Sequence, residues 1–101
     1  MEGHAVISAD VLASYAADAA LTVAGVHGLV GSALLRHEGV KISREDGKVG
    51  VELHVVLDWG ARAGTVGAEV QTSVAEYLLR MADVRPDSVE VVIDEFASPG
   101  R

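Results

Sequence analysis

The chain has no cysteine and little aromatic character. Without a thiol it can form no disulfide framework, no thiolate zinc site and no cysteine nucleophile, which agrees with a reducing compartment. Its aromatic residues are Tyr15, Trp59, Tyr77 and Phe96. The composition therefore predicts an aliphatic core, rich in valine and alanine, that is held together by packing alone.

Positive charge is also scarce, because 15 acidic residues outnumber 8 basic ones and leave a net charge of −7. Such a surface repels phosphate backbones and anionic lipid head groups. No apolar run approaches the roughly 20 residues that cross a bilayer. The first four residues lack the basic start of a signal peptide. We therefore expect no nucleic acid partner and no direct membrane insertion.

The chain is expected to form a single domain over residues 1–101, with a core at 3–96 and a frayed C-terminal tail. The clearest structural pattern within it lies in residues 49–59. Alternate positions there carry Val49, Val51, Leu53, Val55, Leu57 and Trp59. The positions between them carry Gly50, Glu52, His54, Val56 and Asp58. Successive side chains of a strand point to opposite faces, so this pattern predicts a long strand with only one buried face.

The remaining pattern predicts two helices and three further strands. Helices are expected at 9–23, capped by Ser8, and at 65–82, capped by Thr65. Further strands are expected at 5–7, 39–43 and 88–96, with Asp46-Gly47 as a hairpin turn before the long strand. The segment 25–38 is left open as a loop or a short helix. The predicted fold is α+β, in the order β-α-β-β-α-β, with two helices packed on one face of a small mixed sheet.

Helical spacing predicts which sides of the two helices are buried. In the first helix the buried line is Leu12, Ala16, Ala19 and Val23, broadened by Val11 and Tyr15. The small residues of this helix are a second candidate surface for association: Ala13, Ala17, Ala20 and Ala24. Rows of small residues are, however, more often part of the core. In the second helix the apolar stripe is Val66, Val70, Val74, Tyr77, Leu78 and Met81.

The polar side of the sheet is the main candidate interaction site. It combines valines with acidic residues, and alternation predicts that it contains Glu52, His54, Val56, Asp58, Glu90, Val92 and Asp94, with Phe96 as a further candidate. Isolated exposed valines need no explanation. Valines that adjoin across paired strands form a mixed patch suited to self-association or to a protein partner.

Catalytic and metal-binding motifs are not found in the sequence. No histidine has the spacing of a metal site, and His54, beside Glu52 and Asp58, is more simply a residue of a solvated strand face than a pH-sensitive or weak metal site. The adjacent acids Asp94 and Glu95 are expected on opposite faces, and Glu45-Asp46 lies in a turn. We therefore expect no catalytic residue, no metal, no cofactor and no enzymatic activity.

Two other functions remain open at this stage. The glycines at 25, 28 and 31 permit close backbone approach to a ligand, so a small-ligand or enzymatic pocket near 25–38 is the main alternative. Gly25-Val26-His27-Gly28 also has the spacing of the loop by which KH domains hold single-stranded nucleic acid. That interpretation ranks third because the segment and the chain lack basic residues.

The pattern as a whole resembles the alkaline shock protein family of bacterial general-stress and envelope-stress proteins. The resemblance covers residues 3–96 and rests on four blocks. They are 3–8 with Asp10-Val11-Leu12, the helical 16–20 followed by Val23-Ala24-Gly25-Val26, the 39–42 strand, and 49–60 ending in Trp59-Gly60. Val70-Gln71 with Val74 and the closing Val89-Glu90-Val91 strand add to it. The chain departs from the family at Gly64-Thr65-Val66, where relatives commonly begin the second helix with Ile-Pro.

The resemblance implies a non-enzymatic, cytoplasmic interaction or scaffold protein that self-associates. It also implies recruitment to the inner membrane by a membrane-anchored partner protein. The family offers no catalytic residue to carry over to this sequence.

Overall fold

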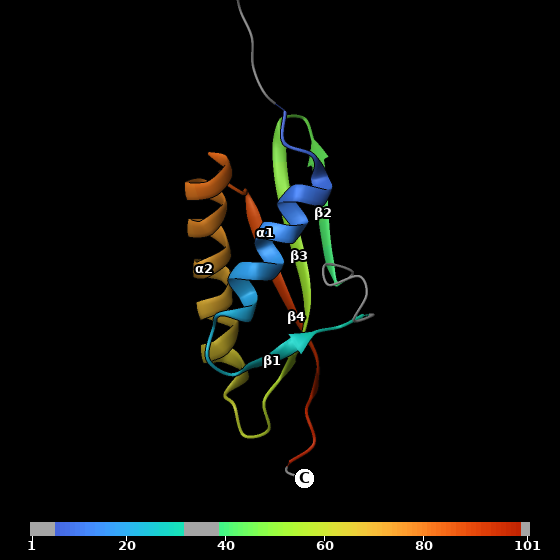
Figure 1. Cartoon of the computed structure of the whole chain (residues 1–101), viewed down its shortest axis with the longest axis vertical. Coiled ribbons are helices and arrows are strands. Elements are labelled where there is room, and N and C mark those ends of the chain that lie inside the picture. The colour runs from blue at the N-terminus through green and yellow to red at the C-terminus, as the bar shows by residue number, and fades with distance from the viewer. Residues whose placement is uncertain (1–5, 32–38, 100–101) are drawn as a thin grey trace, which may run out of the picture.

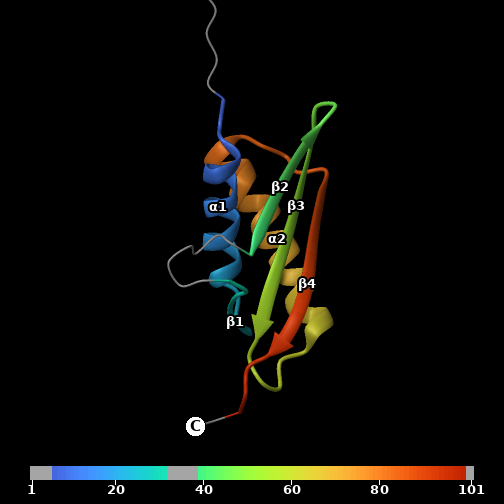
Figure 2. The same cartoon turned by 90° about the vertical axis from the view of Figure 1, so that its right-hand side faces the viewer.

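Two helices cover one face of a four-stranded sheet in the computed structural model, which describes residues 6–31 and 39–99 (Figures 1 and 2). The elements in chain order are α1 (Ala9–Leu21), β1 (Val26–Leu29), β2 (Val40–Glu45), β3 (Lys48–Leu57), α2 (Ala63–Ala82) and β4 (Ser88–Phe96). The α+β class and the packing of both helices on one face of a mixed sheet are confirmed.

β3 is the centre of the sheet and has neighbours along both edges. β2 pairs with its first half and β1 with its last residues, both antiparallel and on the same edge. β4 pairs parallel with β3 along the other edge, from Gly50↔Ser88 to Leu57↔Phe96. A β3–α2–β4 connection is what a parallel neighbour requires, because the chain must cross over to start the second strand from the same end.

One strand lies elsewhere than the sequence predicts. Residues 6–8 form no strand, and Ala5 lies outside the described residues. The fourth strand is instead β1, inside the segment that sequence reasoning left open, while residues 32–38 of that segment lie outside the described part. Ile7 still stays close to the sheet, since its carbonyl oxygen accepts a hydrogen bond from the Arg44 guanidinium.

Helix ends show which local signals determined the boundaries. The Ser8 side chain accepts a hydrogen bond from the Val11 amide at 3.1 Å, so the predicted cap of α1 is confirmed. The predicted cap of α2 is wrong: α2 begins two residues earlier, after Arg62, and no side chain caps it. α2 ends at Asp83, which adopts a left-handed conformation at φ 55°.

The core lies between the helices and the sheet and is entirely aliphatic. Its buried members include Leu12, Ala16, Val23, Leu53, Leu57, Val70 and Leu78. The predicted line of α1 and most of the α2 stripe are confirmed, but Val11 and Met81 are 40% and 45% exposed. Tyr15 and Tyr77 meet edge to face at 5.9 Å between ring centroids, at the border of the core.

The alanine row of α1 is part of this core rather than an association surface. Ala13, Ala17 and Ala20 are buried, and only Ala24 is exposed. Small side chains let α1 approach its neighbours closely, so simple packing accounts for the row.

Two turns depend on glycine. Asp46 and Gly47 have φ of 52° and 77°, and they join β2 to β3 as the predicted hairpin. Gly25, with φ of 99°, follows α1 and lies against α2: a Cβ on Gly25 would approach the Val66 side chain to 2.7 Å. This close approach joins the end of α1 to the start of α2.

Candidate functional site: the open face of the sheet

The candidate site is the face of the sheet that the helices leave uncovered. Along β3 the side chains alternate between buried and half-buried: Val51, Leu53, Val55 and Leu57 face the helices, and Glu52, His54 and Val56 face away. The strand register then decides the neighbours on this open face. Lys41, Glu52 and Glu90 are aligned across the sheet, and Val92 is aligned with His54.

His54 lies between two carboxylates at the centre of the open face. Its Nε2 is 2.6 Å from a Glu52 carboxylate oxygen, and its Nδ1 is 3.2 Å from Asp94 on β4. The side chain of His54 is 28% exposed, so the cluster is only partly shielded from water. A protonated imidazole can donate to both carboxylates at once, whereas a neutral one can donate to only one of them.

This arrangement raises the pKa of the His54 imidazole above its ordinary value of 6.5. The hydrogen bond with Glu52 is the main cause, partial burial opposes it, and Asp94 adds to the rise. The cluster is therefore a bridge between β3 and β4 whose strength depends on protonation of His54. Within the described part of the chain, no group of three or more potential ligands could hold a metal ion.

The predicted member Asp58 lies apart from this cluster. It follows the end of β3, and its carboxylate is 3.2 Å from Nδ1 of His27 on β1. Its amide donates to the carbonyl of Gly25, so the residue is tied to the β1 edge. The predicted neighbours of His54 were Glu52 and Asp58; the structure places Asp94 there instead of Asp58.

A β-bulge at Asp94 changes the facing of the residues after it. Ile93 pairs with Val55, but the next paired residue, Glu95, is aligned with Val56 on the open face. Asp94 reaches His54 on that same face, so the prediction that Asp94 and Glu95 point to opposite faces is wrong. A bulge inserts one residue into a strand and so resets its alternation.

The same bulge moves Phe96 away from the open face. Phe96 is aligned with Leu57, which faces the helices. It borders a hollow of about 370 Å³ with Trp59, Gly60 and Ala61, and Trp59 is 65% exposed rather than buried as predicted. Two of the four aromatic residues thus meet at one end of the sheet.

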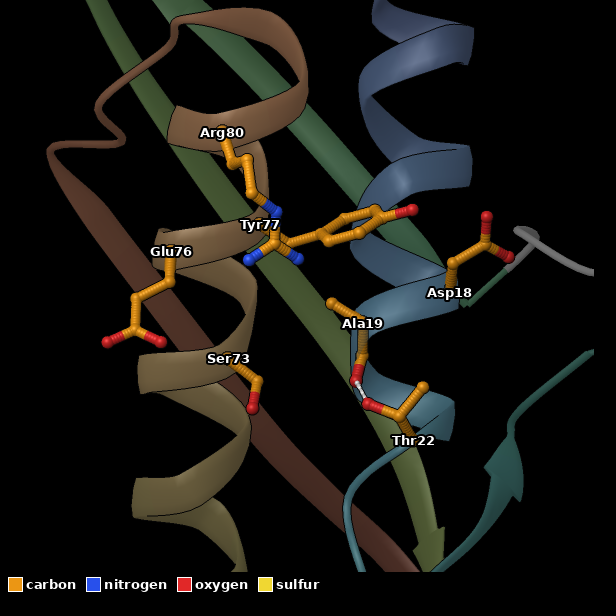
Figure 3. A pocket seen from close by; sticks show the side chains of 7 residues that line it. All are labelled: Asp18, Ala19, Thr22, Ser73, Glu76, Tyr77 and Arg80. Atoms are coloured by element: carbon orange, nitrogen blue, oxygen red, sulfur yellow. Dashed lines mark hydrogen bonds between the residues drawn. The ribbon is translucent and has the colours of Figure 1, made fainter.

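A second hollow lies between the two helices (Figure 3). It has a volume of about 230 Å³ and is lined by Asp18, Ala19, Thr22, Ser73, Glu76, Tyr77 and Arg80. The Arg80 guanidinium lies over the Tyr77 ring at 5.3 Å from its centroid, while the Glu76 carboxylate points away from both in Figure 3. Sequence reasoning missed this groove, because it depends on the angle between the helices.

The segment Gly25-Val26-His27-Gly28 is not a nucleic-acid-binding loop between two helices. Val26, His27 and Gly28 belong to β1, in which Val26 and Gly28 pair with β3. The two hollows described above are lined by residues other than 25–31. Residues 32–38 lie outside the described part of the chain, so the pocket near 25–38 stays a prediction.

The fold and the open face define a small α+β domain with an uncovered, mixed polar and apolar sheet surface. The chain belongs to the alkaline shock protein 23 family, described as having a cell envelope-related function, and matches it over residues 1–97. The resemblance seen in the sequence is thereby confirmed. In the described residues, no helix is both long and apolar enough to span a bilayer.

A solved structure of a MamM C-terminal domain (MamM-CTD) variant is similar in fold. Its TM-score is 0.55 at 15% sequence identity, covering 83% of this chain and 92% of that one. At this identity the likeness concerns the fold alone. No curated protein sequence matches the chain.

Proposed function

We propose that this protein is a non-enzymatic interaction module with a cell envelope-related role, which acts by binding protein through the open face of its sheet. The observation that carries the proposal is the open face itself. In the described chain both helices lie on the opposite side, which leaves Val56 and Val92 half-buried among carboxylates. A mixed surface of this kind suits reversible protein association.

The family supports the envelope part of the proposal, since its description is cell envelope-related. Envelope contact is proposed to come through a partner protein, because the net charge of −7 repels anionic lipid. We further propose a cytoplasmic location, peripheral at the inner membrane when the partner is bound.

Self-association is one form that this binding can take. Light scattering coupled to size exclusion tests it with wild-type protein, Val56→Glu and Val92→Glu. A wild-type oligomer that becomes monomeric in both variants would place self-association on the open face. A monomer in all three samples would move the search to a different partner protein or to a ligand pocket.

A survey by cross-linking and affinity capture tests the proposal more broadly. The expected result is recovery of the protein itself or of an envelope protein. Recovery of neither would refute the proposed function and favour the alternative, a small-ligand site. The groove between the helices is then the place to examine, through thermal shifts with metabolites.

A further inference from the structure

The β4 edge of the sheet has no partner strand in the described part of the chain. β3 is paired on both sides, but β4 is paired only with β3 (Figure 2). β4 spans nine residues, Ser88–Phe96, and its centre consists of the strand-forming residues Val91, Val92 and Ile93. An unpaired strand edge presents a row of backbone donors and acceptors on which another extended segment can pair.

The hydrogen bonds and the register of β3 show which amides of β4 face this edge. Successive amides of a strand point to opposite edges. His54 directs its amide and carbonyl toward Gly39 and Val30, so Leu53 and Val55 direct theirs toward β4. In the register Leu53↔Val91 and Val55↔Ile93, the amides of Glu90 and Val92 therefore point to β3. The amides of Val91 and Ile93 point to the free edge, where the carbonyl of Val89 accepts a hydrogen bond from the Gln71 side chain.

The side chains beside this edge are acidic. Glu90, Asp94 and Glu95 are all exposed on β4, and Glu52 lies next to them on β3. The nearest basic residue aligned with this group is Lys41, on the far side of β3. The free edge thus combines unpaired backbone groups, aliphatic strand formers and negative charge.

We propose that the free edge of β4 binds an extended, positively charged segment of a partner protein, which adds to the sheet as a further strand. Backbone pairing would provide the affinity, and lysine or arginine side chains beside Glu90 and Glu95 would provide the selectivity. This proposal rests on the proposed function and adds the place and the chemistry of the partner.

The charges also argue against a second copy as the occupant. A copy that presented its own β4 would bring the same three carboxylates to the contact, and like charges across paired strands are destabilising. Charged edge residues protect strands against unselective pairing. Here the negative charge of the β4 edge disfavours pairing with acidic segments and favours pairing with basic ones.

A synthetic peptide tests the proposal directly. The probe is a dye-labelled nine-residue peptide of alternating lysine and valine, matched to the length of β4. Fluorescence anisotropy measures its affinity, and amide hydrogen exchange by NMR reports on the edge. We expect binding that slows exchange at the amides of Val91 and Ile93. A peptide with glutamate in place of lysine should not bind.

Val91→Pro tests the backbone contribution. Proline removes an amide that is not used in pairing with β3, so the strand should persist while the edge is blocked. We expect the affinity to fall at least about tenfold, the effect of losing one hydrogen bond and adding a steric obstacle. Circular dichroism checks that the fold is retained.

A pair of charge variants keeps the test decisive if Val91→Pro does not fold. Glu90→Gln with Glu95→Gln removes two charges at the edge, and Glu69→Gln with Glu76→Gln removes two exposed charges on α2. We expect several-fold weaker binding in the first double variant and a change within about twofold in the second.

Several results would overturn the proposal: no binding, binding that leaves the two amides unprotected, or equal weakening by both double variants. Undiminished binding to a folded Val91→Pro would also overturn it. The proposed function is tested separately, by whether partner capture is lost in Val56→Glu. That capture can succeed even if the peptide does not bind at the β4 edge.

Discussion

On β3 the residues that face the helices and those that face away differ in what constrains them. Val51, Leu53 and Val55 are at most 2% exposed and are fixed by packing from both helices. Glu52 and His54 are only partly covered, and their partners are charged side chains. The covered face is thus determined by the volume of its side chains, and the open face by charge and strand register. Stability should depend on the first and recognition on the second.

Leu53→Ala should produce the largest effect. The side chain is fully buried, so its removal leaves a cavity and should lower the free energy of unfolding by about 2–5 kcal/mol. Val56→Ala on the open face should cost about 1 kcal/mol or less. Urea denaturation of both variants measures the difference. Equal losses would mean that the open face is packed as firmly as the covered one.

Gly25→Ala should have the next largest effect. A methyl group there combines a φ of 99° with an approach of 2.7 Å to Val66, so we expect a loss of about 1–3 kcal/mol. Gly28→Ala on β1 is the matched control, because a Cβ there meets nothing within 4 Å. Thermal unfolding should leave the control close to wild type. A Gly25→Ala variant as stable as Gly28→Ala would contradict the proposed close approach of the turn to α2.

The smallest effect should come from pH. Because the pKa of His54 is raised in the folded chain, its contribution to stability is complete below the unfolded value of 6.5. The contribution is lost as pH rises through the folded pKa. For a partly exposed bridge we expect at most about 1 kcal/mol.

His54→Gln isolates this contribution. Unfolding midpoints of wild type and variant, measured from about pH 5.5 to pH 9, should differ most at the acidic end and converge at the alkaline end. A difference that stays constant with pH would show that the bridge between β3 and β4 does not depend on protonation of His54.

The covered face was largely predictable from sequence, for physical reasons. Burial imposes a strict period, so the alternation of Val51, Leu53 and Val55 and the helical spacing of Val66 and Val70 are sufficient to locate β3 and α2. The hairpin at Asp46-Gly47 was equally clear, because its backbone needs two residues of positive φ.

The open face was less predictable because it depends on which strands are neighbours. Glu52 and His54 are two residues apart on one strand, so their proximity follows from alternation. Asp94 joins them because β4 lies beside β3, and this pairing has no local sequence signal. The bulge, which also has none, turns Glu95 onto the same face. β1 was missed because it is four residues long and contains His27 and Gly28, which break the alternation.

The most direct test of the central claim is quantitative affinity capture from envelope fractions with three forms of the protein. Val56→Glu introduces a charge on the open face, and Met81→Glu introduces the same charge at an apolar residue of α2 that is 45% exposed. We expect wild type and Met81→Glu to recover the same proteins and Val56→Glu to lose them. Full recovery by Val56→Glu, or an equal loss with Met81→Glu, would show that the open face is not the binding surface.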